Sequence, residues 1–354
     1  STDVWSYGSV PGPILRVKQG NMLTVKLNNL LTEPTTIHWH GLRLENPMDG
    51  VPFLTQIPVA PNDSFTYSFR ANDAGTFWYH PHVNSAEQVG RGLSGVLVVE
   101  EESPPDVDRD LVWVLDDWRL QRDGLIAEFG NFHDFSHAGR LGNMATINGQ
   151  YDHPLKLTSS ERIRLRLVNT ANARVFALKF LKHEPWRIAV DGHPVEPQKF
   201  GDNAITVPPG GRVDLIMDAN GKPGEKMEIH DVAYPRTAYL LAQIQYGTDT
   251  VRASKSRSAP QALKNNPVVT PDFDHAEFHE MSFQGGAMGR LSQAEFNGKI
   301  QSLRELAARG MVWAINGKIA APMVQANIGP PMLRLKLGHS YIMRWKNETA
   351  FEHP

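Results

Sequence analysis

The chain has 354 residues, a net charge of -2 from 36 Lys and Arg against 38 Asp and Glu, and no cysteine. This length suffices for two or three domains with sizeable cores, whereas the balanced charge excludes an electrostatic footprint for nucleic acid or anionic lipid. The absence of cysteine excludes disulfides, cysteine-bound metals and thiol nucleophiles, so any metal chemistry rests on histidine. Apolar runs are far shorter than the ~20 residues of a membrane-spanning helix, so we expect neither nucleic acid nor membrane as a partner.

Short segments in which apolar and polar residues alternate predict β-strands along the chain. Residues 65–69 and 164–167 are examples, and such alternation is typical of half-buried strands. A pattern of two such segments closed by Asn occurs three times with the same spacing, at 15–29, 155–169 and 333–347. A repeat of this kind indicates repeated structural units.

The repeat predicts an all-β fold of consecutive Greek-key β-sandwich domains, because units of roughly 100–150 residues made of short strands suit that architecture. We expect domains at residues 1–103 and 104–255, followed at 256–354 by a linker, a helix and the start of a third, incomplete domain. The boundaries rest on the segment 101–105, which ends in two prolines, and on the polar stretch 252–272.

Two His-x-His pairs lie in the first predicted domain, His38 with His40 and His80 with His82. In an extended strand residues i and i+2 point to the same side, so each pair directs two imidazoles to one point. Neutral imidazoles suit copper, zinc, iron or nickel, although hydrogen-bonded histidines without a metal are the alternative. The corresponding segment of the second domain, 224–231, lacks the pair, so the fold itself does not require it. Further histidines among loop and polar residues are weak ligand candidates: His133, His137, His153, His183, His193, His230, His275, His279 and His339.

The expected exception to the β pattern is a helix over residues 291–309. Ser292 and Glu295 have the spacing of a capping box, apolar residues recur at helical spacing after them, and Gly310 is placed to end the helix. We expect a packing or connecting helix without a catalytic residue.

The histidine pairs belong to a larger set of segments that resembles the first domain of the bacterial three-domain multicopper oxidases, the laccase-like group: 5–13, 38–41, 48–52, 55–56, 75–82 and 92–95. The closing residues 347–354 resemble the approach to the family's His-Pro-x-His-x-His-Gly motif and contain its first two residues. The resemblance covers essentially the whole chain, and it implies cupredoxin-like domains with copper as the cofactor.

Position by position, the resemblance implies which histidines bind which copper ion. His38 corresponds to a ligand of the type 2 copper, His40 and His80 to ligands of one type 3 copper, and His82 to a ligand of its partner. His353 corresponds to a histidine ligand of the type 1 copper.

Asp49 corresponds to the acid beside the trinuclear cluster that helps deliver protons to reduced oxygen. The alternative is a turn residue, because Asp-Gly is also a common turn pair. The family binds type 1 copper through a cysteine and the trinuclear cluster through eight histidines, and only four of those histidines are identified here. We therefore expect type 2 and type 3 copper, with type 1 copper only where a C-terminal part is present.

Three explanations fit the missing ligands. The chain is a cleaved or partly traced oxidase that lacks its last ~90 residues, by analogy with the length of the preceding units; the remainder is a second polypeptide; or the protein is a natural short, copper-poor relative. A sandwich cut after its first strands exposes an edge and apolar residues such as Leu333, Leu335 and Leu337. We therefore expect a C-terminal fragment or a second subunit to cover them.

The function implied by the resemblance is a copper-dependent oxidase that takes single electrons from a reducing small molecule and reduces O2 to water. The 11 methionines are dispersed, which favours phenol-like donors over cuprous ion, the substrate class of a copper-tolerance oxidase. A copper-poor structural or interaction protein on the same scaffold is the rival, and the retained pairs count against it. A two-domain nitrite reductase is disfavoured because a third unit has begun.

The resemblance also implies a periplasmic or secreted protein whose signal peptide has been removed.

Overall fold

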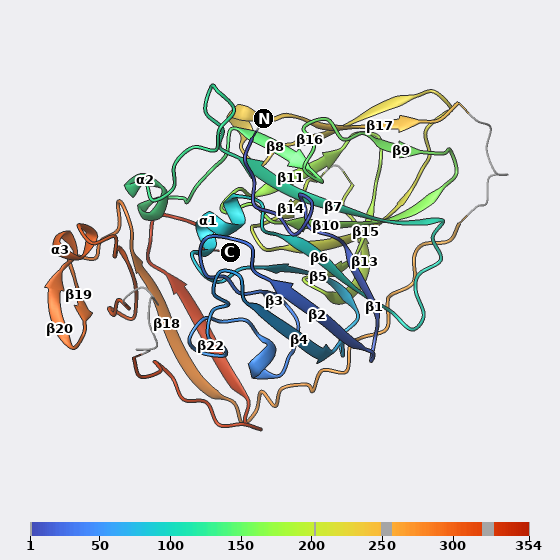
Figure 1. The fold of residues 1–354 in the computed structure, drawn as a ribbon. Coiled ribbons are helices and arrows are strands. Elements are labelled where there is room, and N and C mark those ends of the chain that lie inside the picture. The colour runs from blue at the N-terminus through green and yellow to red at the C-terminus, as the bar shows by residue number, and fades with distance from the viewer. Residues whose placement is uncertain (1, 202, 249–256, 321–328, 354) are drawn as a thin grey trace. The chain divides into compact units, whose positions relative to one another are not determined.

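The computed structural model describes residues 2–201, 203–248, 257–320 and 329–353. The chain forms two compact units, Ser1–Ala127 with Gly142–Pro267, and Glu128–Leu141 with Val268–Pro354. Strands make up most of the regular structure in both (Figure 1). Among the described residues, no helix has the length and apolar composition needed to cross a membrane.

The first β-sandwich lies in the first compact unit and packs a four-stranded sheet, ordered β1-β6-β5-β3, with the pair β2-β4. Its core contains Trp39, Tyr67, Phe77 and Leu97, all of which are fully buried. Alternation along β2 and β4 places one face of each strand on this core, as the sequence pattern predicts. Its elements are β1 (Leu15–Lys18), β2 (Met22–Asn28), β3 (His38–His40), η1 (Asn46–Met48), β4 (Ser64–Arg70), β5 (Gly75–His80), α1 (Ser85–Gly90) and β6 (Gly95–Glu100).

The second β-sandwich, in the same unit, packs the sheet β13-β12-β15-β10-β7-β8 against the sheet β14-β11-β16-β17-β9. Its strand β10 is buried along its whole length. The apolar residues of this sandwich form the largest core cluster among the described residues. Its elements are β7 (Arg109–Trp118), β8 (Met144–Ile147), β9 (Leu155–Leu157), β10 (Arg162–Asn169), β11 (Phe176–Phe180), β12 (Trp186–Val190), β13 (His193–Lys199), β14 (Ile205–Val207), β15 (Arg212–Asp218), β16 (Lys226–Asp231), η2 (Pro235–Thr237) and β17 (Tyr239–Tyr246).

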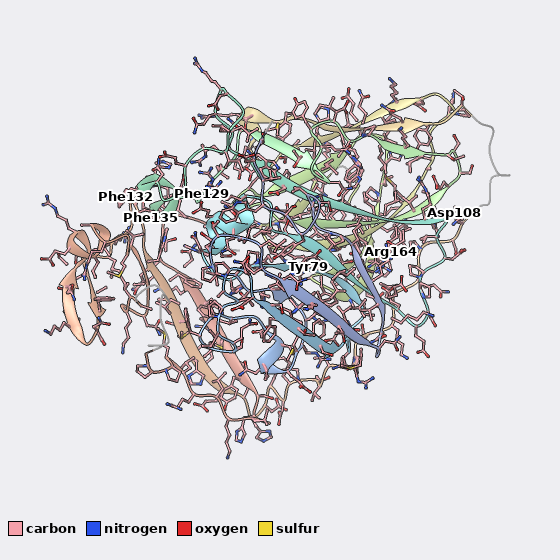
Figure 2. All side chains as sticks on the ribbon, viewed as in Figure 1. Tyr79, Asp108, Phe129, Phe132, Phe135 and Arg164 are labelled. Atoms are coloured by element: carbon pink, nitrogen blue, oxygen red, sulfur yellow. The ribbon has the colours of Figure 1, made fainter. Side chains whose placement is uncertain are left out.

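A buried polar network joins the two sandwiches. The Thr76 hydroxyl on β5 donates to Asp214 on β15 over 2.7 Å, and the Arg166 guanidinium donates to the same hydroxyl over 2.8 Å. Arg164, which is only 1% exposed, pairs with Asp214 and with Glu101 at 2.7 Å (Figure 2). Because these charges are paired and hydrogen-bonded, the interface tolerates their burial.

The second compact unit contains the three-stranded sheet β21-β18-β22 and the hairpin β19-β20. A small apolar core lies around the hairpin and α3, with Leu306 fully buried. The elements of this unit are α2 (Phe132–Ser136), β18 (Glu277–Gly285), β19 (Gln293–Phe296), β20 (Lys299–Ser302), α3 (Leu303–Ala307), β21 (Trp313–Ile315) and β22 (Tyr341–Asn347).

The all-β prediction is confirmed, but the helix expected over 291–309 is wrong. Its first half is the β19-β20 hairpin, and only α3 is helical. Asn297 and Gly298 form the turn with positive φ angles of 51° and 74°, and Asn-Gly is a strong hairpin signal. The capping box that forms is Ser302 with Glu305, ten residues later in the chain than expected.

The third copy of the repeat forms only in part. Its second segment is β22, whereas residues 333–336 form no strand. The corresponding strands of the first two copies, β1 and β9, each pair in parallel with the closing strand of their own sandwich, β6 and β17. In the described residues of the second compact unit no strand follows β22, so residues 333–336 have no such partner.

The sequence predicts three exposed leucines near β22, and two of them are exposed in the structure. Leu335 is 49% exposed and Leu337 is 100% exposed, whereas Leu333 is half-buried. The domain limits stay predictions, because both sandwiches belong to one compact unit. The limit expected at residue 255 lies outside the described residues.

Candidate metal centre

Strands β3 and β5 bring the two histidine pairs together. They run antiparallel with His38 directly opposite His80, and His40 follows two residues along the same face of β3. Trp39, between the two histidines, points to the opposite face and is fully buried in the core. Strand alternation therefore directs the imidazoles to one face of β3 and places Trp39 on the other face, where its burial in the core holds the strand in position.

The imidazoles of four predicted ligands converge. One ligating nitrogen from each of His38, His40 and His80 lies within 4.8 Å of those of the other two. The ring of His82, which follows the end of β5, has its centroid 4.3 Å from that of His38 and 5.1 Å from that of His80. The structure thus places all four on one site.

Hydrogen bonds to the far ring nitrogens orient two of these imidazoles. His38 Nδ1 lies 2.8 Å from the Asp49 carbonyl oxygen and 3.3 Å from its carboxylate. His80 Nδ1 lies 3.1 Å from the Pro81 carbonyl oxygen. A ring whose Nδ1–H donates to an oxygen presents the lone pair of Nε2, which is the arrangement typical of metal-bound histidine. The predicted residue Asp49 therefore contacts the site through His38.

Burial keeps the inner imidazoles neutral. It lowers the pKa of His40 to about 3, with Arg212 and the neighbouring histidines adding to the effect. It lowers the pKa of His82 to about 4 and holds that of His80 well below its ordinary value. At neutral pH each of these rings therefore keeps one N–H and one nitrogen lone pair, and the lone pair is free to bind a metal. Several neutral imidazoles directed at one point suit copper, so the residues fit the group that the sequence implies.

The wall of the site includes residues that the sequence analysis missed. The indole of Trp78 stacks on His80 with ring centroids 3.9 Å apart. From the second sandwich, Gly210 approaches His40 so closely that a Cβ there would lie 3.2 Å from its Cε1. Arg212 on β15 is 4% exposed and donates to the Gly210 carbonyl over 2.8 Å. Tertiary packing alone brings this segment to the histidines, and no sequence spacing reveals it.

His353 belongs to the second compact unit. Its ring lies 5.3 Å from that of Phe283 and 5.1 Å from that of Trp313, between centroids. Its Nε2 is 3.0 Å from the Thr349 hydroxyl. Its assignment to type 1 copper stays a prediction.

Comparison with known proteins agrees with this geometry. Two family models, both described as multicopper oxidase, match residues 1–104 and 110–227. The crystal structure of a multi-copper oxidase from Pseudomonas parafulva is 33% identical in sequence, covers 100% of this chain and is itself covered to 79%, with a TM-score of 0.82. The chain belongs to the multicopper oxidase family.

Curated relatives of this multicopper oxidase include a laccase and a copper resistance protein. Laccase-1 of Thanatephorus cucumeris is 33% identical over 61% of this chain and 41% of its own length. Copper resistance protein A of Escherichia coli is 30% identical over 74% of this chain and 49% of its own length. The chain thus spans about half or less of the length of these relatives.

Proposed function

We propose that this chain carries one half of the oxygen-reducing copper site of an oxidase that oxidises phenol-like or similar donors one electron at a time. The observation that supports the proposal is the convergence of four histidines on one point, three of them with ligating nitrogens within 4.8 Å. O2 is the acceptor and water the product. Oxidation of cuprous ion is the second candidate, favoured by the similarity to a copper resistance protein.

Each residue has a proposed role. His38 binds the type 2 copper, His40 and His80 bind one type 3 copper, and His82 binds the other. When bound, copper supplies the one-electron chemistry that O2 reduction requires. The strands hold the imidazoles rigid, and the Asp49 carbonyl fixes the ring of His38. The Asp49 carboxylate, which is 34% exposed and 3.3 Å from His38 Nδ1, has the role of passing protons from solvent toward the site.

The ligand assignment is tested with His38→Ala and His80→Ala in the complete protein, with the exposed His193→Ala as the matched control. We expect both ligand variants to lose copper and O2 consumption, because each removes an imidazole from a shared site, while the control retains both. Unchanged copper content in the ligand variants would contradict the assignment. In the same assays Asp49→Asn keeps the backbone carbonyl, so a loss of O2 reduction at full copper content separates a proton role from a turn role.

The remaining parts of the site are proposed to come from outside this chain. A C-terminal fragment or a second subunit supplies the other cluster ligands and the type 1 thiolate, since His353 alone cannot form a type 1 centre. The family resemblance further supports export to the periplasm or the medium, where such an oxidase receives its copper.

A further inference from the structure

Three arginines that are at most 4% exposed lie where the two sandwiches meet: Arg164 and Arg166 on β10, and Arg212 on β15. Arg164 and Arg166 both pair with the buried carboxylate of Asp214, at 2.5 and 3.1 Å. Each also contacts a second carboxylate, at 2.7 Å. Two of the three buried positive charges are therefore compensated within the protein.

Arg212 differs from these two, because among the described residues no buried carboxylate contacts its guanidinium. Its one carboxylate contact there is with Asp191, at 3.3 Å, whose side chain is 53% exposed. The guanidinium donates instead to the backbone carbonyls of Gly210, Asp191 and Thr76, over 2.8, 3.0 and 3.4 Å. Burial lowers the pKa of Arg212 below its ordinary value, whereas at Arg164 the carboxylates overcome burial and raise the pKa. The hydrogen bonds of Arg212 are thus satisfied, while its charge is not balanced inside the protein.

This charge lies beside the histidine site. Gly210, whose carbonyl accepts the Arg212 N–H, packs on His40, since a Cβ on Gly210 would lie 3.2 Å from the Cε1 of that ring. Gly41, the residue after His40, lies so close to Arg212 Nη2 that no side chain fits between them. After burial, the Arg212 charge is the largest cause of the lowered pKa of His40. The field of the guanidinium therefore reaches the imidazole through a buried, weakly screening interior.

We propose that the buried charge of Arg212 makes the copper site beside His40 favour Cu(I) over Cu(II). The inference rests on the proposed function, in which His40 is a copper ligand. A fixed positive charge repels a divalent ion more strongly than a monovalent one, so it raises the reduction potential of the site. The electron comes from the reducing donor, and a site of higher potential accepts it more readily. Groups outside the ligand set are known to tune metals in this way.

Asp191 offers a change of opposite electrostatic sign that leaves the local structure in place. Its Oδ1 accepts the backbone N–H of Arg212 over 2.9 Å, and the amide oxygen of Asn accepts the same bond. Its φ is 50°, in the left-handed region that Asn tolerates. Asp191→Asn therefore removes the half-exposed negative charge that partly offsets Arg212, whereas Arg212→Met removes the positive charge itself. Arg212→Lys retains a positive charge at the same position.

The test is a redox titration of the complete, copper-loaded protein without O2, in which the Cu(I) fraction is followed at the X-ray absorption edge. Copper content and melting temperature are measured on the same samples. Copper ions in other sites are common to all variants, so differences between the curves report the site beside Arg212. The matched control is Arg162→Met, which removes another buried arginine, 6% exposed, at the opposite end of the β10–β15 pair.

We expect Arg212→Met to lower the midpoint potential and Asp191→Asn to raise it, both at full copper content. Arg212→Lys stays nearer to the parent than Arg212→Met, and Arg162→Met keeps the parent's potential even where it lowers the melting temperature. A merely structural role of Arg212 does not produce shifts of opposite sign.

Unchanged potentials in both charge variants, or shifts in the same direction, would overturn the proposal. Where Arg212→Met loses copper or fails to fold, the sign of the Asp191→Asn shift decides alone. Failure of the proposed function is read separately, as unchanged copper content in His38→Ala and His80→Ala.

Discussion

At His40, segments that are remote in the sequence meet. Gly41, the next residue, has a φ of 88°, and a Cβ there would lie 2.2 Å from the Arg212 Nη2. That nitrogen cannot retreat easily, because it donates to the Asp191 carbonyl over 3.0 Å in a buried position. The glycine therefore meets both a backbone requirement and a packing requirement beside a predicted ligand.

Gly41→Ala is expected to lower both the melting temperature and the copper content. The matched control is Gly20→Ala, at a φ of 83°, where a Cβ would have no neighbouring atom within 4 Å. The control suffers only the left-handed strain of about 1 kcal/mol, whereas Gly41→Ala also displaces Arg212 and the strand end that carries His40. Equal losses of stability with full copper content in both variants would show that packing against Arg212 does not position His40.

A buried histidine outside the site makes stability depend on pH. His183 Nε2 lies 2.6 Å from the Tyr246 hydroxyl and Nδ1 lies 3.1 Å from the Leu181 carbonyl, and burial lowers the pKa of His183 below its ordinary value. The unfolded chain, with a pKa of about 6.5, takes up a proton before the folded chain does. The stabilising contribution is therefore complete above about pH 6.5 and declines as the pH falls below it, by at most ~1.4 kcal/mol per pH unit.

The check is the free energy of unfolding of the metal-free chain at pH 7.5 and pH 5.5, for the parent and for His183→Gln. We expect the parent to lose more stability than the variant over this interval. The exposed His193→Gln should behave like the parent. Parallel pH curves for all three chains would refute a titrating role for His183.

Sequence alone identified the residues whose chemistry follows from local spacing. His38, His40, His80 and His82 were found because i and i+2 share a face in any strand. Arg212 was not found, because its proximity to His40 results from the packing of two sandwiches and no local pattern encodes it.

At the scale of elements, the polar network between β5, β10 and β15 holds the histidine strand against the second sandwich. Asp214, which is 1% exposed, is the acceptor shared by Thr76, Arg164 and Arg166. Asp214→Asn removes the negative charge between two buried guanidiniums. We expect a loss of about 3 kcal/mol in the free energy of unfolding, as for other broken buried pairs.

The matched control is Glu184→Gln, which breaks the exposed pair with Lys199 at 2.9 Å. Its cost should stay below about 1 kcal/mol. Chemical denaturation of both variants measures the difference. Similar, small costs for the two changes would mean that the network does not hold the sandwiches together.

The elements were predicted best where sequence and tertiary partner agree. The first two copies of the repeat formed strands because each has a closing strand to pair with. Residues 333–336 have the same pattern but no described partner strand, and they form none. The hairpin at residues 293–302 shows the converse error, in which helical spacing outweighed the turn signal of Asn297 and Gly298.

At the scale of the whole molecule, the surface around β22 exposes an unpaired strand edge and apolar side chains to which the described residues give no cover. β22 is an edge strand, and Trp345 is 50% exposed and Leu337 fully exposed beside it. Exposed apolar edges of this kind mark interaction surfaces. We expect protein purified from its natural source to carry a companion fragment or second chain on this face, visible by intact mass and denaturing gel. One 39.5 kDa species with no companion would count against it.

The central claim is that the two histidines of β3, the last histidine of β5 and the histidine two residues after it are copper ligands. The most direct measurement is a crystal structure of copper-loaded protein with anomalous differences recorded at the copper absorption edge. The account predicts anomalous peaks within coordination distance of the imidazoles of His38, His40, His80 and His82. Fully loaded crystals in which those rings contact only backbone and water, with no peak between them, would contradict it.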